Sequence, residues 1–103
     1  MQVVNSTEFD QIIREEANVL VDFFATWCGP CKMLGPVLEE LDQKWNGNPR
    51  IIKVDVDESS DLAMRFGIMS VPTMILFKNG QAVKQLQGYQ PAAALQANIE
   101  ALL

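Results

Sequence analysis

The sequence predicts an α/β fold in which helices pack against a mixed β-sheet. Residues 19–25 form a nearly continuous apolar run of strand-forming residues, typical of a central strand covered on both faces. A helical pattern and a second apolar run at residues 51–56 follow, and such a strand–helix–strand unit joins two parallel strands by a right-handed crossover. Asn79-Gly80 lies between two further strand patterns and is a strong type I′ hairpin signal, which adds an antiparallel pair.

Composition and charge describe one folded domain, which we place over residues 1–103. Apolar residues make up 49% of the chain and charged residues 20%, which are ordinary values for a globular protein. The net charge of −5 is unsuited to neutralising phosphates, which argues against nucleic-acid binding. The chain has no membrane-spanning run, and residues 1–6 have no basic or apolar leader pattern. We therefore expect a cytoplasmic monomer without membrane contact.

Two helices are expected in the first half of the chain. Asn5 or Ser6 caps an amphipathic helix that ends near residues 17–18. After the central strand, apolar residues recur at helical spacing over residues 34–45, which predicts a long helix with one buried face. Pro36 lies inside this helix and removes a backbone donor, so a kink is expected near it.

The second half of the chain alternates short elements with turns. Ser59 or Ser60 caps a short helix that Gly67 closes in the left-handed conformation. The second strand of the hairpin is polar and resembles an edge strand, and Pro91 starts the final helix. The two hairpin strands are expected at residues 73–77 and 82–87.

The strongest functional signal is the pair Cys28 and Cys31, in a chain without histidine. Structural zinc and iron–sulfur sites use about four ligands, so no bound metal is expected unless two chains share a site. A disulfide between these cysteines closes a loop too short to stabilise the fold much. A redox dithiol is therefore the main interpretation. Inert buried thiols, a partner-binding module that uses the dithiol as a redox latch, and a metal site between two chains remain as alternatives.

Asp22 is the one charge in the central strand. A carboxylate among apolar residues is costly, so we expect burial to raise its pKa, as is common at functional sites. A helix that returns over the sheet would bring Cys31 near this carboxylate, which could then accept the Cys31 proton. The alternative is a charge that faces a polar pocket or the rim of the sheet.

Two further groups of residues have simpler interpretations. Four methionines are expected to fill gaps in the core, namely Met33, Met64, Met69 and Met74. Four acidic residues near the start of the short helix are expected to form a solvated surface, with steering of partners as a second possibility. They are Asp55, Asp57, Glu58 and Asp61.

Several motifs together resemble the thioredoxin family. In chain order they are Val21-Asp22-Phe23, Trp27-Cys28-Gly29-Pro30-Cys31-Lys32, Pro36, Lys53, Val71-Pro72-Thr73, Phe77-Lys78-Asn79-Gly80 and Gly88. They cover nearly the whole chain, and Trp-Cys-Gly-Pro-Cys with a Val-Pro-Thr segment about 40 residues later is very specific to this family. The resemblance implies a thioredoxin fold, with three α/β/α layers and four helices around a central mixed sheet of five strands.

The resemblance also implies an activity. Thioredoxins are thiol–disulfide oxidoreductases that reduce disulfides in other proteins and hold no bound cofactor. They are themselves reduced with NADPH by a flavin-dependent thioredoxin reductase, which would be a partner of this chain. Gly29-Pro30 between the cysteines is typical of the reducing members, whereas isomerase and oxidant relatives usually have a histidine there.

Four residues receive roles in catalysis. Cys28 is expected at a helix N-terminus, where the helix dipole lowers a thiol pKa, so we assign it as the nucleophile. Cys31 lies about one turn further along the helix and is assigned as the resolving thiol. Asp22 matches the family's buried acid, and Lys53 matches the lysine that pairs with it. A strand lysine that extends to solvent is the alternative for Lys53.

The resemblance places a shallow substrate groove around Cys28. Its expected members are Trp27, Gly29, Pro30, Val71, Pro72, Gly88 and Tyr89. Ordinary chemistry favours a trans bond before Pro72, whereas the resemblance implies a cis bond that turns the Val71 backbone toward an extended substrate. Tyr89 is bulkier than the residue often found there and is expected to narrow target choice. Phe24 stands where many thioredoxins have a second tryptophan, a departure that leaves the chemistry intact.

Overall fold

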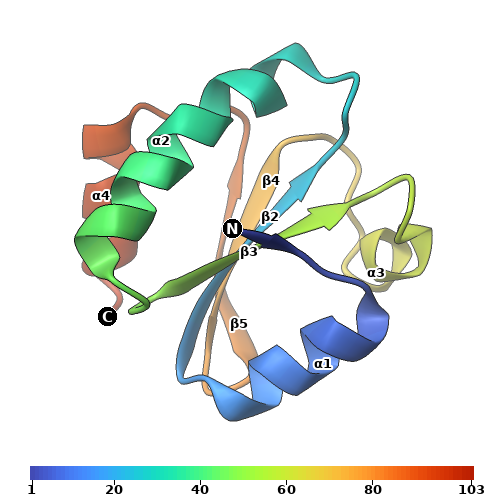
Figure 1. Cartoon of the computed structure of the whole chain (residues 1–103), viewed down its shortest axis with the longest axis horizontal. Coiled ribbons are helices and arrows are strands. Elements are labelled where there is room, and N and C mark those ends of the chain that lie inside the picture. The colour runs from blue at the N-terminus through green and yellow to red at the C-terminus, as the bar shows by residue number, and fades with distance from the viewer.

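The sheet and its helices are arranged as the sequence predicts. The computed structural model describes all 103 residues. Its elements are β1 (Gln2–Val3), α1 (Ser6–Glu15), β2 (Asn18–Phe24), α2 (Gly29–Trp45), β3 (Arg50–Asp55), α3 (Ser60–Arg65), β4 (Thr73–Lys78), β5 (Gln81–Gln87) and α4 (Ala92–Glu100). The strands form one sheet in the order β1-β3-β2-β4-β5, with α2 and α4 on one face and α1 and α3 on the other (Figure 1). The three-layer fold is confirmed.

The central strand is β2. It pairs in parallel with β3 and antiparallel with β4, as the strand–helix–strand unit and the hairpin signal predict. In the turn between β4 and β5, Asn79 and Gly80 have positive φ angles of 50° and 82°, which a type I′ turn requires. The polar strand β5 is one edge of the sheet and is mostly exposed, as expected, and β1 is the other edge.

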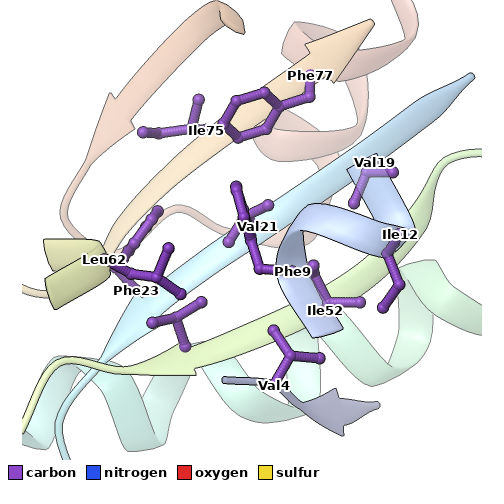
Figure 2. Close-up of a cluster of buried hydrophobic side chains, with 11 residues drawn as sticks. Val4, Phe9, Ile12, Val19, Val21, Phe23, Ile52, Leu62, Ile75 and Phe77 are labelled. Carbon is purple, nitrogen blue, oxygen red and sulfur yellow. The ribbon is translucent and has the colours of Figure 1, made fainter. Parts of the chain in front are cut away.

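Alternation along β2 divides the core between the two faces of the sheet. Val19, Val21 and Phe23 point toward α1 and α3 and belong to a cluster of 11 buried residues (Figure 2). Leu20 points the other way and belongs to a second cluster of 10 buried residues under α2 and α4. Asp22 is two residues after Leu20, so its carboxyl group lies on the α2 face of the sheet.

A capping box starts helix α1. Asn5 is the N-cap, and its side chain accepts a hydrogen bond of 2.9 Å from the backbone N–H of Glu8. The Glu8 carboxylate accepts in return from the backbone N–H of Asn5 at 3.0 Å. Of the two predicted caps, Asn5 is therefore correct, and the helix ends at Glu15, earlier than predicted. Ser59 is the N-cap of α3, one of the two predicted positions, but its side chain makes no capping hydrogen bond.

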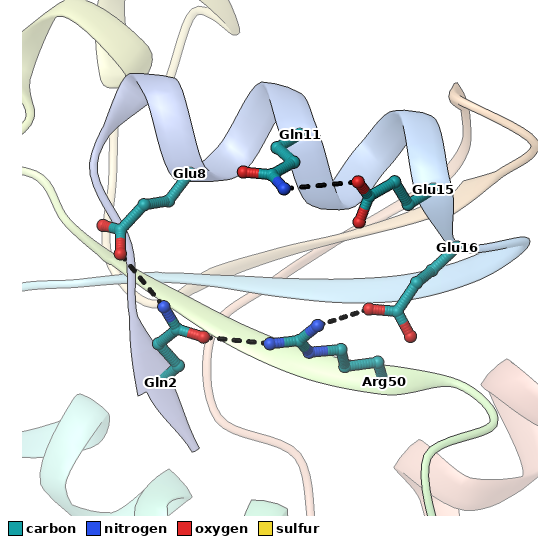
Figure 3. A network of polar contacts seen from close by, with 6 residues as sticks. All are labelled: Gln2, Glu8, Gln11, Glu15, Glu16 and Arg50. Atoms are coloured by element: carbon teal, nitrogen blue, oxygen red, sulfur yellow. Dashed lines mark hydrogen bonds and ion pairs between the residues drawn. The ribbon is translucent and has the colours of Figure 1, made fainter.

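A polar network connects β1 to its neighbours, although no sequence pattern marks this two-residue strand. Arg50 on β3 forms an ion pair with Glu16 and donates to Gln2 Oε1 at 2.9 Å (Figure 3). Gln2 donates in turn to the Glu8 carboxylate at 3.1 Å. These side chains are partly exposed, so each contact contributes little free energy. Together they fix β1 against β3 and α1.

Helix α2 begins inside the cysteine motif. Cys28 is its N-cap, and Pro30 lies in the first turn, where a backbone N–H would have no partner within the helix. The helix continues through Pro36 to Trp45, and Asn46 ends it with a left-handed φ of 48°. The kink at Pro36 stays a prediction. No helix of the protein is both long and apolar enough to cross a membrane.

Candidate active site

The two cysteines lie together where β2 leads into α2. Cys28 caps the helix and Cys31 lies in its first turn, because three positions correspond to nearly one helical turn. Their sulfur atoms form a disulfide, with the two Cα atoms 5.3 Å apart. The backbone N–H of Cys31 donates to Cys28 Sγ at 3.2 Å. The helix therefore directs one of its free N–H groups at the sulfur of Cys28.

Apolar residues enclose the disulfide. Ala25 is buried with both cysteines, and partly buried neighbours pack around them, namely Phe24, Val56 and Val71. Cys28 is 4% exposed and Cys31 is 6% exposed. Accessibility in this oxidised form therefore does not distinguish the two sulfur atoms, and their roles depend on the surrounding groups.

The segment before β4 reaches the dithiol. The carbonyl oxygen of Val71 lies 3.6 Å from Cys28 Sγ. The peptide bond before Pro72 is cis, so the resemblance is confirmed on this point and the trans bond favoured by ordinary chemistry is wrong. The backbone N–H of Gly88 donates to the Pro72 carbonyl at 2.8 Å. This bond brings Gly88 and the half-exposed Tyr89 to the same end of the sheet.

Asp22 is a buried acid on the face of the sheet that α2 covers. Its side chain is 1% exposed, and its Oδ1 atom has no hydrogen-bond partner. Burial raises the pKa of Asp22 from 3.8 to about 6, and the positive charge of Lys53 opposes this rise. Lys53 lies opposite Asp22 in the parallel register of β2 and β3. The predicted rise in pKa is confirmed, and the alternative of a charge at the sheet rim is wrong.

A cavity of about 350 Å³ lies between the start of α2 and the two central parallel strands. Its lining residues are Phe24, Ala25, Thr26, Cys31, Lys32, Gly35 and Lys53. Cys31 and Lys53 thus face one common space. The ammonium group of Lys53 lies 4.5 Å from the centre of the Phe24 ring and forms no ion pair with Asp22.

A second, mostly apolar groove of about 170 Å³ lies next to the dithiol. Its lining residues are Trp27, Val56, Ile68, Met69, Ser70 and Val71. Trp27 is 69% exposed, and its indole N–H donates to Asp57 Oδ2 at 2.9 Å, which holds the ring at the groove. Two of the predicted groove residues, Trp27 and Val71, therefore line this surface. Gly29 and Pro30 lie at the exposed start of α2, outside its lining.

Part of this groove is formed by a methionine, although the methionines are predicted to fill the core. Met74 is fully buried, as expected, but Met33, Met64 and Met69 are 61%, 82% and 92% exposed, so the core interpretation is wrong for these three. Met69 instead lines the groove. The available signal was its position in the loop that also contains Val71, two residues later.

The acidic group near α3 is also less exposed than predicted. Asp55 is 8% exposed, and its Oδ1 atom accepts from the backbone N–H groups of Asp57 and Glu58 at 2.9 and 3.4 Å. Asp55 therefore stabilises the turn after β3, and the solvated-surface prediction is wrong for this residue. Asp57 is exposed but supports Trp27.

The fold and the dithiol define the class of protein. A Cys-Gly-Pro-Cys disulfide at the start of a helix on a mixed five-stranded sheet is the redox centre of a thiol–disulfide oxidoreductase. The thioredoxin family model matches residues 1–101. The thioredoxin of Alicyclobacillus acidocaldarius is 47% identical, with 97% of this chain and 95% of the relative covered. The thioredoxin of Staphylococcus saprophyticus is 50% identical, with 94% and 92% covered.

A solved structure of Plasmodium falciparum thioredoxin superposes with a TM-score of 0.93 at 41% identity, and the match covers 100% of both chains. The chain belongs to the thioredoxin family. It is a protein-disulfide reductase that acts on target disulfides, and this family holds no bound cofactor of its own. The partner-binding alternative, in which the dithiol is incidental or a latch, is not favoured.

Proposed function

We propose that the protein reduces target disulfides in two exchange steps, with Cys28 as nucleophile and Cys31 as resolving thiol. The Cys28 thiolate attacks one sulfur of the target, forms a mixed disulfide and releases the other target sulfur as a thiolate. The Cys31 thiolate then attacks Cys28 Sγ, so that the Cys28–Cys31 disulfide forms and the remaining target sulfur leaves as a thiolate. Two electrons pass to the target, whose thiolates take up the two protons that the cysteines release.

The position of Cys28 at the N-cap of α2 carries this assignment. The free N–H groups and the positive end of the helix dipole stabilise a thiolate there. One of these groups, the N–H of Cys31, already donates to Cys28 Sγ at 3.2 Å. Cys31 lies within the first turn, where its own sulfur receives no such hydrogen bond. Cys28 is therefore the thiol that the helix acidifies.

Alkylation of the reduced protein tests the two cysteine roles. Iodoacetamide at mildly acidic pH is expected to modify Cys28 faster than Cys31, on the order of tenfold, because the thiolate is the reactive form and the helix favours it at Cys28. Tandem mass spectrometry of the peptide that contains both cysteines gives the two rates. In denaturant the helix is absent, so the difference should vanish. Faster modification of Cys31 in the folded protein would reverse the assignment.

Asp22 is proposed to accept the Cys31 proton in the resolving step, with Lys53 as its charged neighbour. A carboxyl group whose pKa is raised to about 6 is a stronger base than an ordinary aspartate, because its pKa is closer to that of a thiol. Its side chain lies on the sheet face that α2 covers, and Lys53 lines the same cavity as Cys31. The proton passes from Cys31 to Asp22 directly or through one water molecule.

The groove beside Cys28 is proposed to bind the target segment around its disulfide. The Val71 backbone before Pro72 offers its polar groups to an extended peptide, and the exposed face of Trp27 covers the peptide's apolar side chains. The proposed target-binding surface is wider than this groove. It comprises the predicted residues Trp27, Gly29, Pro30, Val71, Pro72, Gly88 and Tyr89, together with Val56, Ile68 and Met69 from the groove lining.

Electrons are proposed to come from NADPH through a flavin-dependent thioredoxin reductase, with residues 1–103 acting as a monomeric single domain in the cytoplasm. The family assignment and the bacterial relatives support this route. With a bacterial thioredoxin reductase and insulin, NADPH absorbance is expected to fall only when the protein is present, and Cys31→Ser should not replace it. Insulin reduction with dithiothreitol but none with the reductase would point to another electron donor.

A further inference from the structure

Lys53 lies beside Asp22 on the neighbouring strand, but its ammonium group contacts an aromatic ring and forms no ion pair with the carboxylate. The two residues are direct partners in the register of β2 and β3, so their side chains leave the same face of the sheet. Asp22 nevertheless has an unpartnered Oδ1 atom and belongs to no ion pair. The Lys53 ammonium lies over the ring of Phe24, 4.5 Å from its centre.

We propose that Phe24 is a positioning residue in this protein. Its aromatic ring holds the Lys53 ammonium at the cavity and away from the Asp22 carboxylate. This inference rests on the proton-accepting role proposed for Asp22. Phe24 is two residues after Asp22 on β2, so both side chains lie on the same face, and the ammonium has two competing partners on one strand. An aromatic face within about 6 Å of an ammonium attracts it through the ring's quadrupole.

The cavity explains why the ring can compete with a carboxylate. Phe24 and Lys53 both line this space, and Lys53 is only partly buried. At the ring, the ammonium stays at the edge of the cavity and keeps part of its hydration. At the carboxylate of Asp22, which is 1% exposed, it would have to be desolvated to form an ion pair. The ring therefore stabilises the arrangement in which Asp22 stays unpaired.

The other groups around Asp22 leave Lys53 as the charge that Phe24 can control. The helix α2 contributes Cys31 and the exposed Lys32 to the cavity. Strand β4 places the uncharged Met74 opposite Asp22. Asp55, the other charged residue of β3 on this face, hydrogen-bonds the turn that follows it.

The position of the ammonium determines how good a base Asp22 is. Burial raises the pKa of Asp22 to about 6, and the positive charge of Lys53 acts in the opposite direction. An ammonium placed on the carboxylate would lower this pKa further and weaken Asp22 as an acceptor for the Cys31 proton. By keeping the Lys53 ammonium away from the carboxylate, Phe24 thus keeps Asp22 an effective proton acceptor.

A double-mutant cycle between Phe24 and Lys53 tests the proposal, with the Asp22 titration as readout. The carboxyl carbon of Asp22 is followed by NMR against pH in the oxidised full-length protein. Phe24→Leu removes the ring and frees the ammonium, so the pKa of Asp22 is expected to fall by at least about half a unit, which corresponds to about 0.7 kcal/mol. Phe24→Trp keeps an aromatic face and should preserve the wild-type value. Lys53→Met alone should raise the pKa, since it removes the opposing charge.

The decisive comparison is Phe24→Leu in the Lys53→Met background. With no ammonium to hold, removal of the ring is expected to leave the pKa of Asp22 unchanged there. An equal fall in both backgrounds would mean that the ring acts by excluding water, and no fall in either would mean that it does not act on Asp22. Both results would overturn the proposal. Phe24→Met provides a second ring-free variant if Phe24→Leu does not fold. The titration does not depend on turnover. Its outcome is therefore independent of the proton-accepting role proposed for Asp22, which is tested separately by the rate of the resolving step in an Asp22→Asn variant.

Discussion

Replacing either cysteine by serine is expected to reduce the rate of dithiothreitol-driven insulin reduction to the uncatalysed level, a loss on the order of 100-fold or more. Cys28→Ser removes the thiolate that attacks the target disulfide. Cys31→Ser permits the attack but cannot resolve the mixed disulfide, so each molecule reacts at most once. The measurement is the turbidity of the released insulin chains over time.

The two variants should also differ from each other. Cys31→Ser is expected to accumulate a covalent complex with the target that is visible on a non-reducing gel, whereas Cys28→Ser should form little or none. Met64→Leu is a suitable control, because Met64 is 82% exposed and lies outside the groove. If Cys28→Ser traps the target and Cys31→Ser does not, the roles are exchanged. If the folded, reduced wild-type protein does not accelerate the reaction, a binding module becomes the better description.

Asp22→Asn is expected to stabilise the protein at neutral pH and to slow the resolving step. The native state holds the Asp22 proton up to a pH of about 6, whereas the unfolded chain releases it near the ordinary value of 3.8. Between these values the native state binds more protons than the unfolded chain, so the free energy of unfolding falls as pH rises. The full destabilisation by the buried, ionised Asp22 is present above pH 6. A difference of about 2 units corresponds to about 3 kcal/mol, the upper limit of the gain from Asp22→Asn.

Urea unfolding of the oxidised protein between pH 4 and 8 measures this effect, and Asp22→Asn should flatten the pH dependence. The exposed carboxylate of Glu39 provides a control, since Glu39→Gln should leave the dependence unchanged. The kinetic effect is measured by mixing reduced protein with excess target and following decay of the mixed disulfide. If the folded Asp22→Asn variant resolves this species at the wild-type rate, Asp22 has no part in the proton transfer.

The fold was predictable because its patterns are local. The apolar run of β2, the Asn79-Gly80 turn and the helical spacing after Cys31 each specify an element without knowledge of its neighbours, and every strand predicted from such a pattern lies within one residue of its bounds. Strand β1 carries no such pattern, because two residues show no periodicity. Contacts from distant Arg50 and the pairing with β3 hold it in place, and only the family resemblance anticipated a fifth strand.

The site was only partly predictable, because its walls come from segments far apart in the sequence. The cysteine motif and the charge of Asp22 were evident from the chain alone. By contrast, a methionine carries the same local signal in a core and on a surface, so Met69 could be located at the groove only from the structure. The contact between Lys53 and Phe24 depends on strand register and rotamer, which no residue pattern specifies.

Helix α2 makes the molecule bipolar. It carries the dithiol at its first residues and the exposed Asn46-Gly47-Asn48 turn after its last, and its 17 residues span about 25 Å at the rise of an α-helix. A dye, a tether to a solid support or an inserted peptide at this turn would lie a full helix length from the exchanging sulfur atoms. The protein could thus be immobilised through this turn while the dithiol at the opposite end of the helix remains accessible to large, folded targets.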